Sequence, residues 1–127
     1  MEVNEKIPPG IFFTVDYDHE HYWQKDHFYG CSIDAASSVV KPFDYILYVM
    51  EYNNAIFIRK DCIANDINDL TPEVAYKNGY KDRINRSELF HWNADVENWL
   101  HLDKSDSIKL IKEHFKRYEG KFTLRQI

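Results

Sequence analysis

The sequence is poor in the residues that build phosphate-binding loops and disulfide scaffolds. Only four of its 127 residues are glycine, and no two of them are adjacent. A phosphate-cradling loop needs clustered glycines, so this class of nucleotide site is excluded. The two cysteines, Cys31 and Cys62, stand in apolar surroundings and outside any paired motif. We therefore expect two buried free thiols rather than a disulfide.

Long apolar runs are also missing from the chain. No stretch approaches the roughly 20 apolar residues that a membrane-spanning helix needs. Glu2, Glu5 and Lys6 interrupt the N-terminus, where a signal peptide would carry an apolar run. We therefore expect a cytoplasmic protein with no membrane partner. The length predicts a single domain over residues 1–127.

Aromatic residues are abundant, and acidic residues are concentrated in the first half. Nine tyrosines, eight phenylalanines and three tryptophans make up 16% of the chain, more than one small core needs. Some rings are therefore expected at the surface, where tyrosine and tryptophan favour interfaces. Residues 1–70 carry 12 acidic and five basic side chains, a net charge of −7, whereas residues 71–127 carry nine acidic and 11 basic ones, a net charge of +2. This asymmetry argues against nucleic acid as the main partner and suits a basic protein, with a purely solubilising charge as the alternative.

Strand signals dominate the first half of the chain. Residues 11–15 are β-branched and aromatic and indicate a strand, which follows an irregular lead-in over residues 1–10. The clearest signal is a hairpin, in which residues 45–52 and 55–59 flank an expected turn at Asn53-Asn54. The first arm of this hairpin is almost entirely apolar, so we expect a central strand that is covered on both faces.

Helix signals dominate the second half. Thr71 and Pro72 form a helix start, and Asn78-Gly79 is expected to end that helix. A helical segment is expected over residues 94–102, and a longer helix is expected to begin at the cap Ser105. The apolar face of that helix is formed by Ile108, Ile111, Phe115 and Tyr118. With a final strand over residues 122–127, this order predicts an α+β fold: helices from the C-terminal half pack on an antiparallel sheet that has a central hairpin.

Residues 16–27 combine three histidines with four carboxylates, between strands expected over residues 11–15 and 28–33. We interpret this segment as a loop or strand edge that forms a partner-binding face. Carboxylates speed association with a basic protein, and buried aromatic rings slow dissociation. A solvated acidic loop is the alternative. The residues expected to contact the partner are Asp16, Tyr17, Asp18, Glu20, Tyr22, Trp23 and Asp26.

The same segment supports a second hypothesis. His19 and His21 would lie on one face of a strand beside carboxylates, and imidazole with carboxylate suits zinc or iron. The alternative function is therefore a small metal-dependent hydrolase or nuclease that uses the cluster at residues 16–27. No third histidine stands at a recognised ligand spacing, so we predict no metal and no cofactor.

Other parts of the chain do not indicate catalysis. The cysteines lack the signature of an activated thiolate, and Ser37-Ser38 has no nucleophile elbow. Lys81, Arg83 and Arg86 stand near aromatic residues, a combination that can bind single-stranded nucleic acid. In a net-acidic chain we expect ordinary charge pairing there instead. We therefore predict a protein that is not an enzyme and does not contact nucleic acid directly.

The three tryptophans have different expected surroundings. Trp99 follows Val96 by about one turn of the predicted helix, so it is expected in the core. Trp92, between a histidine and an asparagine, fits either core or surface. Trp23 stands among charged residues and is the best candidate for an exposed interface anchor.

A longer stretch of the chain carries a family resemblance. Its components are the hairpin over residues 45–59, the segments 73–80 and 86–93, and the apolar residues Val96, Trp99 and Leu100. Together they resemble the small immunity proteins of bacterial contact-dependent growth inhibition and related polymorphic toxin systems. The resemblance implies a cytosolic protein that binds one cognate toxin domain and blocks its active site or its access to substrate. A basic nuclease is the expected toxin, and no functional residues are carried over because interfaces vary within that group.

Overall fold

The computed structural model describes residues 1–64 and 66–127 and has an α+β fold, which confirms the predicted class. Its main elements are β1 (Ile11–Val15), α1 (Ile33–Val40), β2 (Tyr45–Glu51), β3 (Asn54–Arg59), α2 (Pro72–Tyr76), α3 (Arg86–Leu89), α4 (Lys104–His114) and β4 (Phe122–Gln126). Two helical segments of other types matter below: the π-helical turn η3 (Lys77–Lys81) and the 3₁₀ segment η4 (His91–Leu100).

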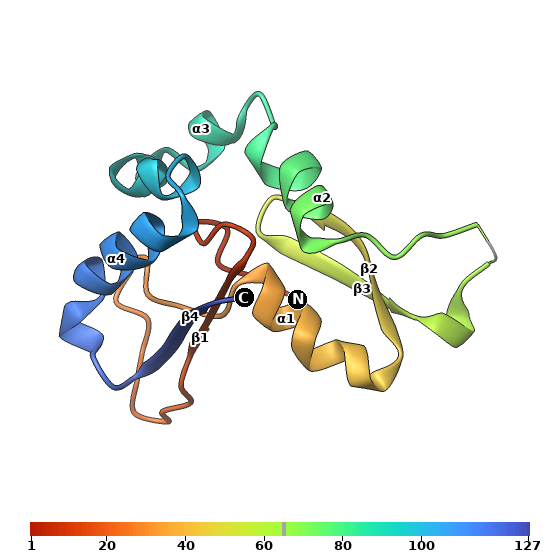
Figure 1. The fold of residues 1–127 in the computed structure, drawn as a ribbon, viewed down its shortest axis with the longest axis horizontal. Coiled ribbons are helices and arrows are strands. Elements are labelled where there is room, and N and C mark those ends of the chain that lie inside the picture. The colour runs from red at the N-terminus through yellow and green to blue at the C-terminus, as the bar shows by residue number, and fades with distance from the viewer. Residues whose placement is uncertain (65) are drawn as a thin grey trace.

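The strands are antiparallel as expected, but they form two two-stranded sheets instead of the single sheet with a central hairpin that was predicted. β1 pairs with β4, and β2 pairs with β3. Helix α1 lies between the two pairs and contacts both β1 and β2 (Figure 1). The C-terminal helix α4 and η4 cover the β1–β4 side, and α2 lies against the β2–β3 hairpin (Figure 1). None of the described helices is long and apolar enough to cross a lipid bilayer.

The first ten residues have the irregular backbone that was expected, and part of this segment lies in the core. Val3 and Ile7 are completely buried. The Val3 N–H donates to the Asn53 carbonyl at 2.8 Å, and the Asn4 N–H donates to the Cys31 carbonyl at 2.8 Å. This segment therefore runs from the β2–β3 hairpin through the interior to β1 and ties the two sheets together.

The strand expected over residues 28–33 is wrong. Within it only Cys31 forms a bridge, opposite Thr14 of β1. Ser32 instead caps α1, because its side chain accepts hydrogen bonds from the backbone N–H groups of Ala35 at 3.2 Å and of Phe13 at 3.1 Å. One serine hydroxyl therefore begins a helix and also fixes that helix to β1.

The hairpin is confirmed, but its turn lies one residue earlier than expected. Glu51 pairs with Asn54, so Tyr52 and Asn53 form the turn. Tyr52 adopts a left-handed conformation with φ of 56°, which is uncommon for an aromatic residue. Its backbone N–H donates to the Gly79 carbonyl at 2.9 Å, and this tertiary hydrogen bond supports the left-handed conformation.

Strand β2 is not covered on both faces as expected. Tyr45 and Tyr48 are exposed, whereas Ile46, Leu47 and Met50 are buried. Because β2 belongs to a two-stranded sheet, one of its faces packs on the core and much of the other faces solvent.

The helix start at Thr71 and Pro72 is confirmed, since the Thr71 hydroxyl accepts from the Val74 N–H. Gly79 does not end that helix: it lies inside η3, and a Cβ at this position would stand 2.0 Å from the Met50 carbonyl oxygen. Glycine is therefore required here by close approach of two backbones and not by a helix stop.

The last helix and strand are also confirmed, with a shifted start. Asp103, and not Ser105, caps α4 by accepting from the Asp106 N–H at 3.0 Å. Ile111 and Phe115 are buried as the apolar stripe predicts, and β4 follows where the final strand was expected.

An aromatic cluster forms the core beneath the β1–β4 sheet. Phe28 stacks on Tyr118 with ring centroids 3.9 Å apart, and Phe13 stacks on Phe115 at 5.6 Å. Phe122 of β4 packs edge-on against Phe28 at 5.8 Å. These contacts join β1, β4 and the end of α4 to the segment that follows residues 16–27.

The cysteines are free thiols, as expected, but they are not both buried. Cys31 is half-buried, and burial raises the pKa of its thiol. Cys62 is exposed, which corrects its predicted burial. It lies in the helical turn after β3, with its sulfur 3.4 Å from the Asp61 carboxylate.

Candidate functional site

The residues predicted to contact a partner lie in one surface loop, the 16–27 loop, between β1 and Phe28. It has no strand, so the loop interpretation is confirmed. Tyr17 is 93% exposed, Tyr22 76% and Trp23 59%. Three large aromatic rings therefore face solvent within seven residues of each other.

Polar contacts hold this loop in place. Asp26 accepts hydrogen bonds from Arg117 and from the Tyr118 hydroxyl. The Trp23 indole N–H donates to the Asp26 carbonyl at 2.8 Å, and Asp18 pairs with Lys121 at 3.5 Å. The loop thus presents its rings from a fixed frame, which lowers the conformational entropy that binding would cost.

Asp26 is set up as an anchor by its surroundings. Burial alone would raise the pKa of its carboxyl, but the hydrogen bonds from Tyr118, the Phe28 N–H and Arg117 together hold the pKa below its ordinary value. The negative charge of Asp26 is therefore stabilised by groups of the protein itself. Among the four carboxylates of the loop, Asp16 and Glu20 are left as the exposed ones.

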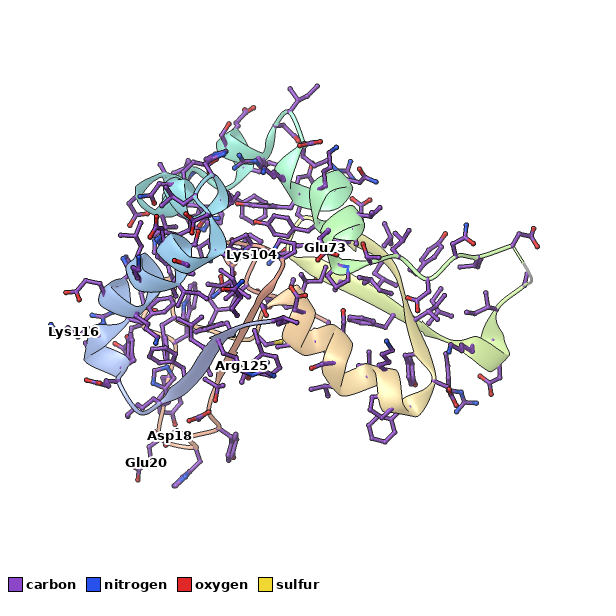
Figure 2. All side chains as sticks on the ribbon, in the orientation of Figure 1. Asp18, Glu20, Glu73, Lys104, Lys116 and Arg125 are labelled. Carbon is purple, nitrogen blue, oxygen red and sulfur yellow. The ribbon has the colours of Figure 1, made fainter. Side chains whose placement is uncertain are left out.

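The predicted face divides into two parts. Figure 2 shows Asp18 and Glu20 at the outer end of the loop, beyond the end of the β1–β4 sheet. The later part, from Trp23 to His27, instead lines a cavity of about 800 Å³. The cavity is lined by Glu2, Glu5, Lys6, Trp23, Lys25, Asp26, His27, Tyr29, Asn53, Phe90, Trp92, Asp95 and His114.

Aromatic side chains dominate the mouth of this cavity. Trp92 is 55% exposed, which settles its position at the surface, and Trp23 is exposed as predicted. Both line the cavity together with Phe90 and Tyr29. Trp99 is buried, as expected from the helical pattern. We call Trp23 and Trp92 the cavity rim.

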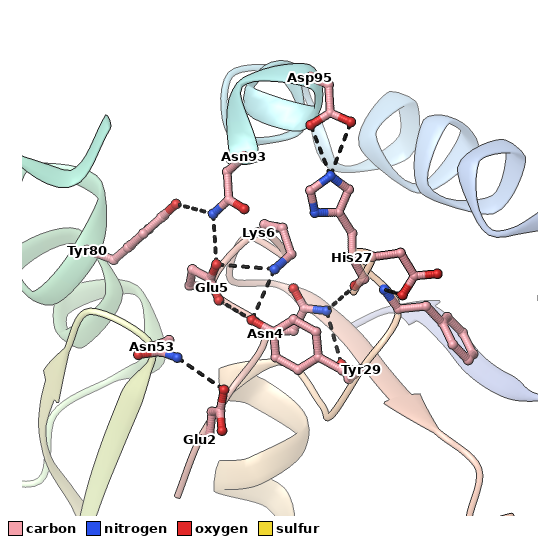
Figure 3. Close-up of polar contacts among 12 residues, drawn as sticks. Glu2, Asn4, Glu5, Lys6, His27, Tyr29, Asn53, Tyr80, Asn93 and Asp95 are labelled. Atoms are coloured by element: carbon pink, nitrogen blue, oxygen red, sulfur yellow. Dashed lines mark hydrogen bonds and ion pairs between the residues drawn. The ribbon is translucent and has the colours of Figure 1, made fainter. Parts of the chain in front are cut away.

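A buried polar network forms the floor of the cavity (Figure 3). Glu5 and Lys6 are only 1% and 2% exposed. The Lys6 ammonium lies 3.2 Å from a Glu5 carboxylate oxygen and donates to the Tyr29 hydroxyl at 3.0 Å, while Tyr29 donates to the other Glu5 oxygen. Asn93 donates to Glu5 at 2.7 Å and to the Tyr80 hydroxyl at 3.0 Å.

The network is arranged to compensate for burying charge. Burial lowers the pKa of the Lys6 ammonium although Glu5 opposes the shift, and burial together with Glu5 raises the pKa of the Tyr29 hydroxyl. Tyr29 therefore stays neutral and keeps donating to Glu5. A buried ion pair persists only when further hydrogen bonds satisfy it, as they do here. This network was not predicted from the sequence, because Glu5 and Lys6 are residue types that are normally exposed.

Histidines meet a carboxylate at the side of the cavity. His27 Nε2 lies 2.9 and 3.1 Å from the two oxygens of Asp95, and the His27 and His114 ring centroids are 5.4 Å apart. The predicted pair does not take part: His19 Nε2 is 3.8 Å from Glu20 at the surface, and the His21 ring packs on Phe28 and Tyr118. Only the last histidine of the 16–27 loop therefore belongs to this group.

The two arginines of the basic cluster considered for nucleic acid form charge pairs. Arg83 pairs with Glu51 at 2.7 Å, and Arg86 forms a two-pronged pair with Glu97. These contacts are the ordinary pairing that was expected.

The geometry suits recognition of a basic group by aromatic faces and carboxylates. Exposed indole rings attract cations through their π faces, and Glu2 and Asp95 add carboxylates beside the rim.

No protein family, curated protein or solved structure matches this chain.

Proposed function

We propose that this chain is an immunity protein that binds and neutralises a cognate basic toxin domain through the 16–27 loop and the cavity rim. The observation that carries the proposal is the placement of Trp23 and Trp92. They come from distant parts of the sequence, are both more than half exposed, and line the same cavity. Converging exposed tryptophans are the side chains that most often supply binding energy in protein interfaces.

The fixed frame of the loop supports this proposal. Asp26 and Asp18 tie the loop to the segment that follows α4, so Tyr17, Tyr22 and Trp23 are held outward without a partner. Ordered apolar surface of this kind gains free energy when a partner removes it from water. Little of that gain is lost to ordering the loop.

The cavity accounts for a preference for a basic partner. A lysine or arginine side chain of the toxin would enter between the rim tryptophans, where cation–π attraction and the carboxylate of Glu2 favour it. The exposed carboxylates of Asp16 and Glu20 would speed the encounter with a basic surface. Such a toxin is expected to act on nucleic acid, because nucleases need basic substrate surfaces.

The direct test uses the proposed cognate toxin domain, which is sought in the genes that neighbour the gene of this chain. Its dissociation constant is measured by calorimetry with wild type, Trp23→Ala and Trp92→Ala. We expect each substitution to weaken binding by more than about tenfold. Phe43→Ala is the matched control, since Phe43 is also an exposed ring but lies in the turn after α1. Equal affinity for wild type and both tryptophan variants would refute the placement, and no binding to the toxin would refute the function.

The charge contribution is tested separately. Asp16→Lys with Glu20→Lys reverses two exposed charges, whereas Asp18 is avoided because it pairs with Lys121 and accepts from the Glu20 N–H. We expect a slower association rate and a weaker salt dependence, with little change in dissociation. An unchanged association rate would exclude these carboxylates from the encounter.

A further inference from the structure

His27, Asp95 and His114 bring three metal-ligating side chains together from three separate elements. His27 ends the 16–27 loop, Asp95 lies in η4, and His114 is the last residue of α4. One ligand atom from each can be chosen so that all three lie within 4.8 Å of one another. From this geometry we propose that the three residues form a binding site for a divalent transition metal ion, with zinc as the expected ion. The site goes beyond the proposed toxin binding and does not depend on it.

An ion would draw together ligand atoms that lie within 4.8 Å of one another. Zinc binds imidazole nitrogen and carboxylate oxygen at about 2.0–2.2 Å, so two ligands of one tetrahedral ion stand roughly 3.4 Å apart. His27 Nε2 and the Asp95 oxygens are already at 2.9 and 3.1 Å. Zinc would replace the hydrogen bond between these two groups: His27 would bind through Nε2 with its ring proton on Nδ1, and Asp95 would bind through a carboxylate oxygen.

The surrounding structure holds the ligands in position. The buried Asn4 side chain donates to the His27 carbonyl at 2.8 Å and to the Tyr29 carbonyl at 3.0 Å, which fixes the backbone on both sides of Phe28. The buried Trp99 ring packs edge-on against both histidine rings, at 6.4 Å from His27 and 5.2 Å from His114. Supported ligands of this kind lose little freedom when they bind an ion.

The chemistry of the three groups favours zinc over hard cations. Two imidazoles with one carboxylate suit zinc and its neighbours among the first-row metals, whereas magnesium and calcium prefer oxygen ligands alone. The fourth coordination position would open into the cavity, because all three residues line it. Water or an anionic oxygen ligand would occupy that position.

The test is a calorimetric titration of Zn²⁺ into the full-length, metal-free chain, which is prepared without a histidine tag. We expect one zinc ion per chain and no detectable binding of Mg²⁺. His27→Gln, Asp95→Asn and His114→Gln should each weaken zinc binding by more than about tenfold. The matched controls are His19→Gln, in the same loop, and His101→Gln, at the end of η4 beside Glu97; both should bind zinc as wild type does. Wild-type affinity in His114→Gln would overturn the proposal.

A second measurement decides the question even if a variant fails to fold. Nuclear magnetic resonance of the histidine ring nitrogens in the wild-type chain reports which rings bind Zn²⁺. Signals of His27 and His114 should change with one equivalent of zinc, while those of His91 and His101 stay in place. Changes confined to other histidines, or no change at millimolar zinc, would refute this site. Neither experiment contains the toxin, so their failure leaves the immunity proposal standing and its failure leaves the metal site standing.

Discussion

Residues 2–7 and the 16–27 loop are two polar segments without regular secondary structure, yet their surroundings are opposite. In the first segment, Glu5 and Lys6 are almost completely buried. In the second, Tyr17 and Trp23 are mostly exposed. The charged residues therefore lie inside and the aromatic residues outside, the reverse of the usual distribution. Both segments meet at the cavity, where the first forms the floor and the second forms part of the rim.

The comparison shows that hydrogen-bonding partners decide where a charged side chain lies. Glu5 has the ammonium of Lys6, the Tyr29 hydroxyl and the Asn93 amide within hydrogen-bonding distance. The Tyr76 hydroxyl also donates to the Glu5 backbone carbonyl at 2.6 Å. A buried network with this many partners fixes one arrangement of the core, whereas exposed rings on an anchored loop are available to a partner.

Glu5→Ala should have the largest effect on stability. It leaves the Lys6 ammonium buried without its counter-charge, and loss of one member of a buried pair costs about 3–5 kcal/mol. Urea unfolding, monitored by tryptophan fluorescence, measures the loss in the free energy of unfolding. Adding Lys6→Met to Glu5→Ala should restore a large part of it, because the unpaired charge is then gone. A loss below about 1 kcal/mol in the single variant would show that the pair is not buried as described.

Asp26→Asn should have an intermediate effect. The amide cannot form the charged pair with Arg117, and it accepts more weakly from Tyr118 and from the Phe28 N–H. We expect the free energy of unfolding to fall by about 1–2 kcal/mol at neutral pH. Toxin binding should weaken as well, because the frame of the 16–27 loop loosens. Unchanged stability would mean that Asp26 does not anchor the loop.

The effect of Asp26→Asn should also depend on pH. The pKa of Asp26 is lower in the folded protein than its ordinary value of 3.8, so the unfolded chain binds its proton first as pH falls. The stabilisation is therefore complete above about pH 4 and is lost as pH falls through the folded pKa. The stability difference between wild type and the variant should shrink over that window. A constant difference from pH 7 to pH 2.5 would contradict the sign of the pKa shift.

Removal of exposed rings should have the smallest effect on stability. Tyr17→Ser with Tyr22→Ser changes side chains that contact solvent, so the free energy of unfolding should stay within about 0.5 kcal/mol of wild type. Toxin binding should nevertheless weaken. A large loss of stability would indicate that these rings pack against the protein and are not free for a partner.

Local patterns predicted much of the fold. The strands β1 and β4, the β2–β3 hairpin and the cap at Thr71 are specified by residues close together in the chain. The exposure of Trp23 was predictable because its sequence neighbours are charged. Helix α1 was missed because only three small or branched apolar residues, Ile33, Ala35 and Ala36, mark its buried face.

The cavity could not be predicted from the sequence. It depends on contacts between residues that are distant in the chain, such as Glu5 with Asn93 and His27 with Asp95. No periodicity or spacing records such contacts. For the same reason His19 and His21, two residues apart in the sequence, were favoured over His27 and His114, which meet only in the folded protein.

The most direct test of the proposed toxin binding at the exposed segment is amide hydrogen exchange of this chain, free and bound to the proposed cognate toxin domain. We expect new protection over residues 16–27 and around Trp92, with no change over residues 3–7, which are already buried. Protection confined to the β2–β3 hairpin or the outer face of α1, with unchanged exchange in the 16–27 loop, would contradict this expectation.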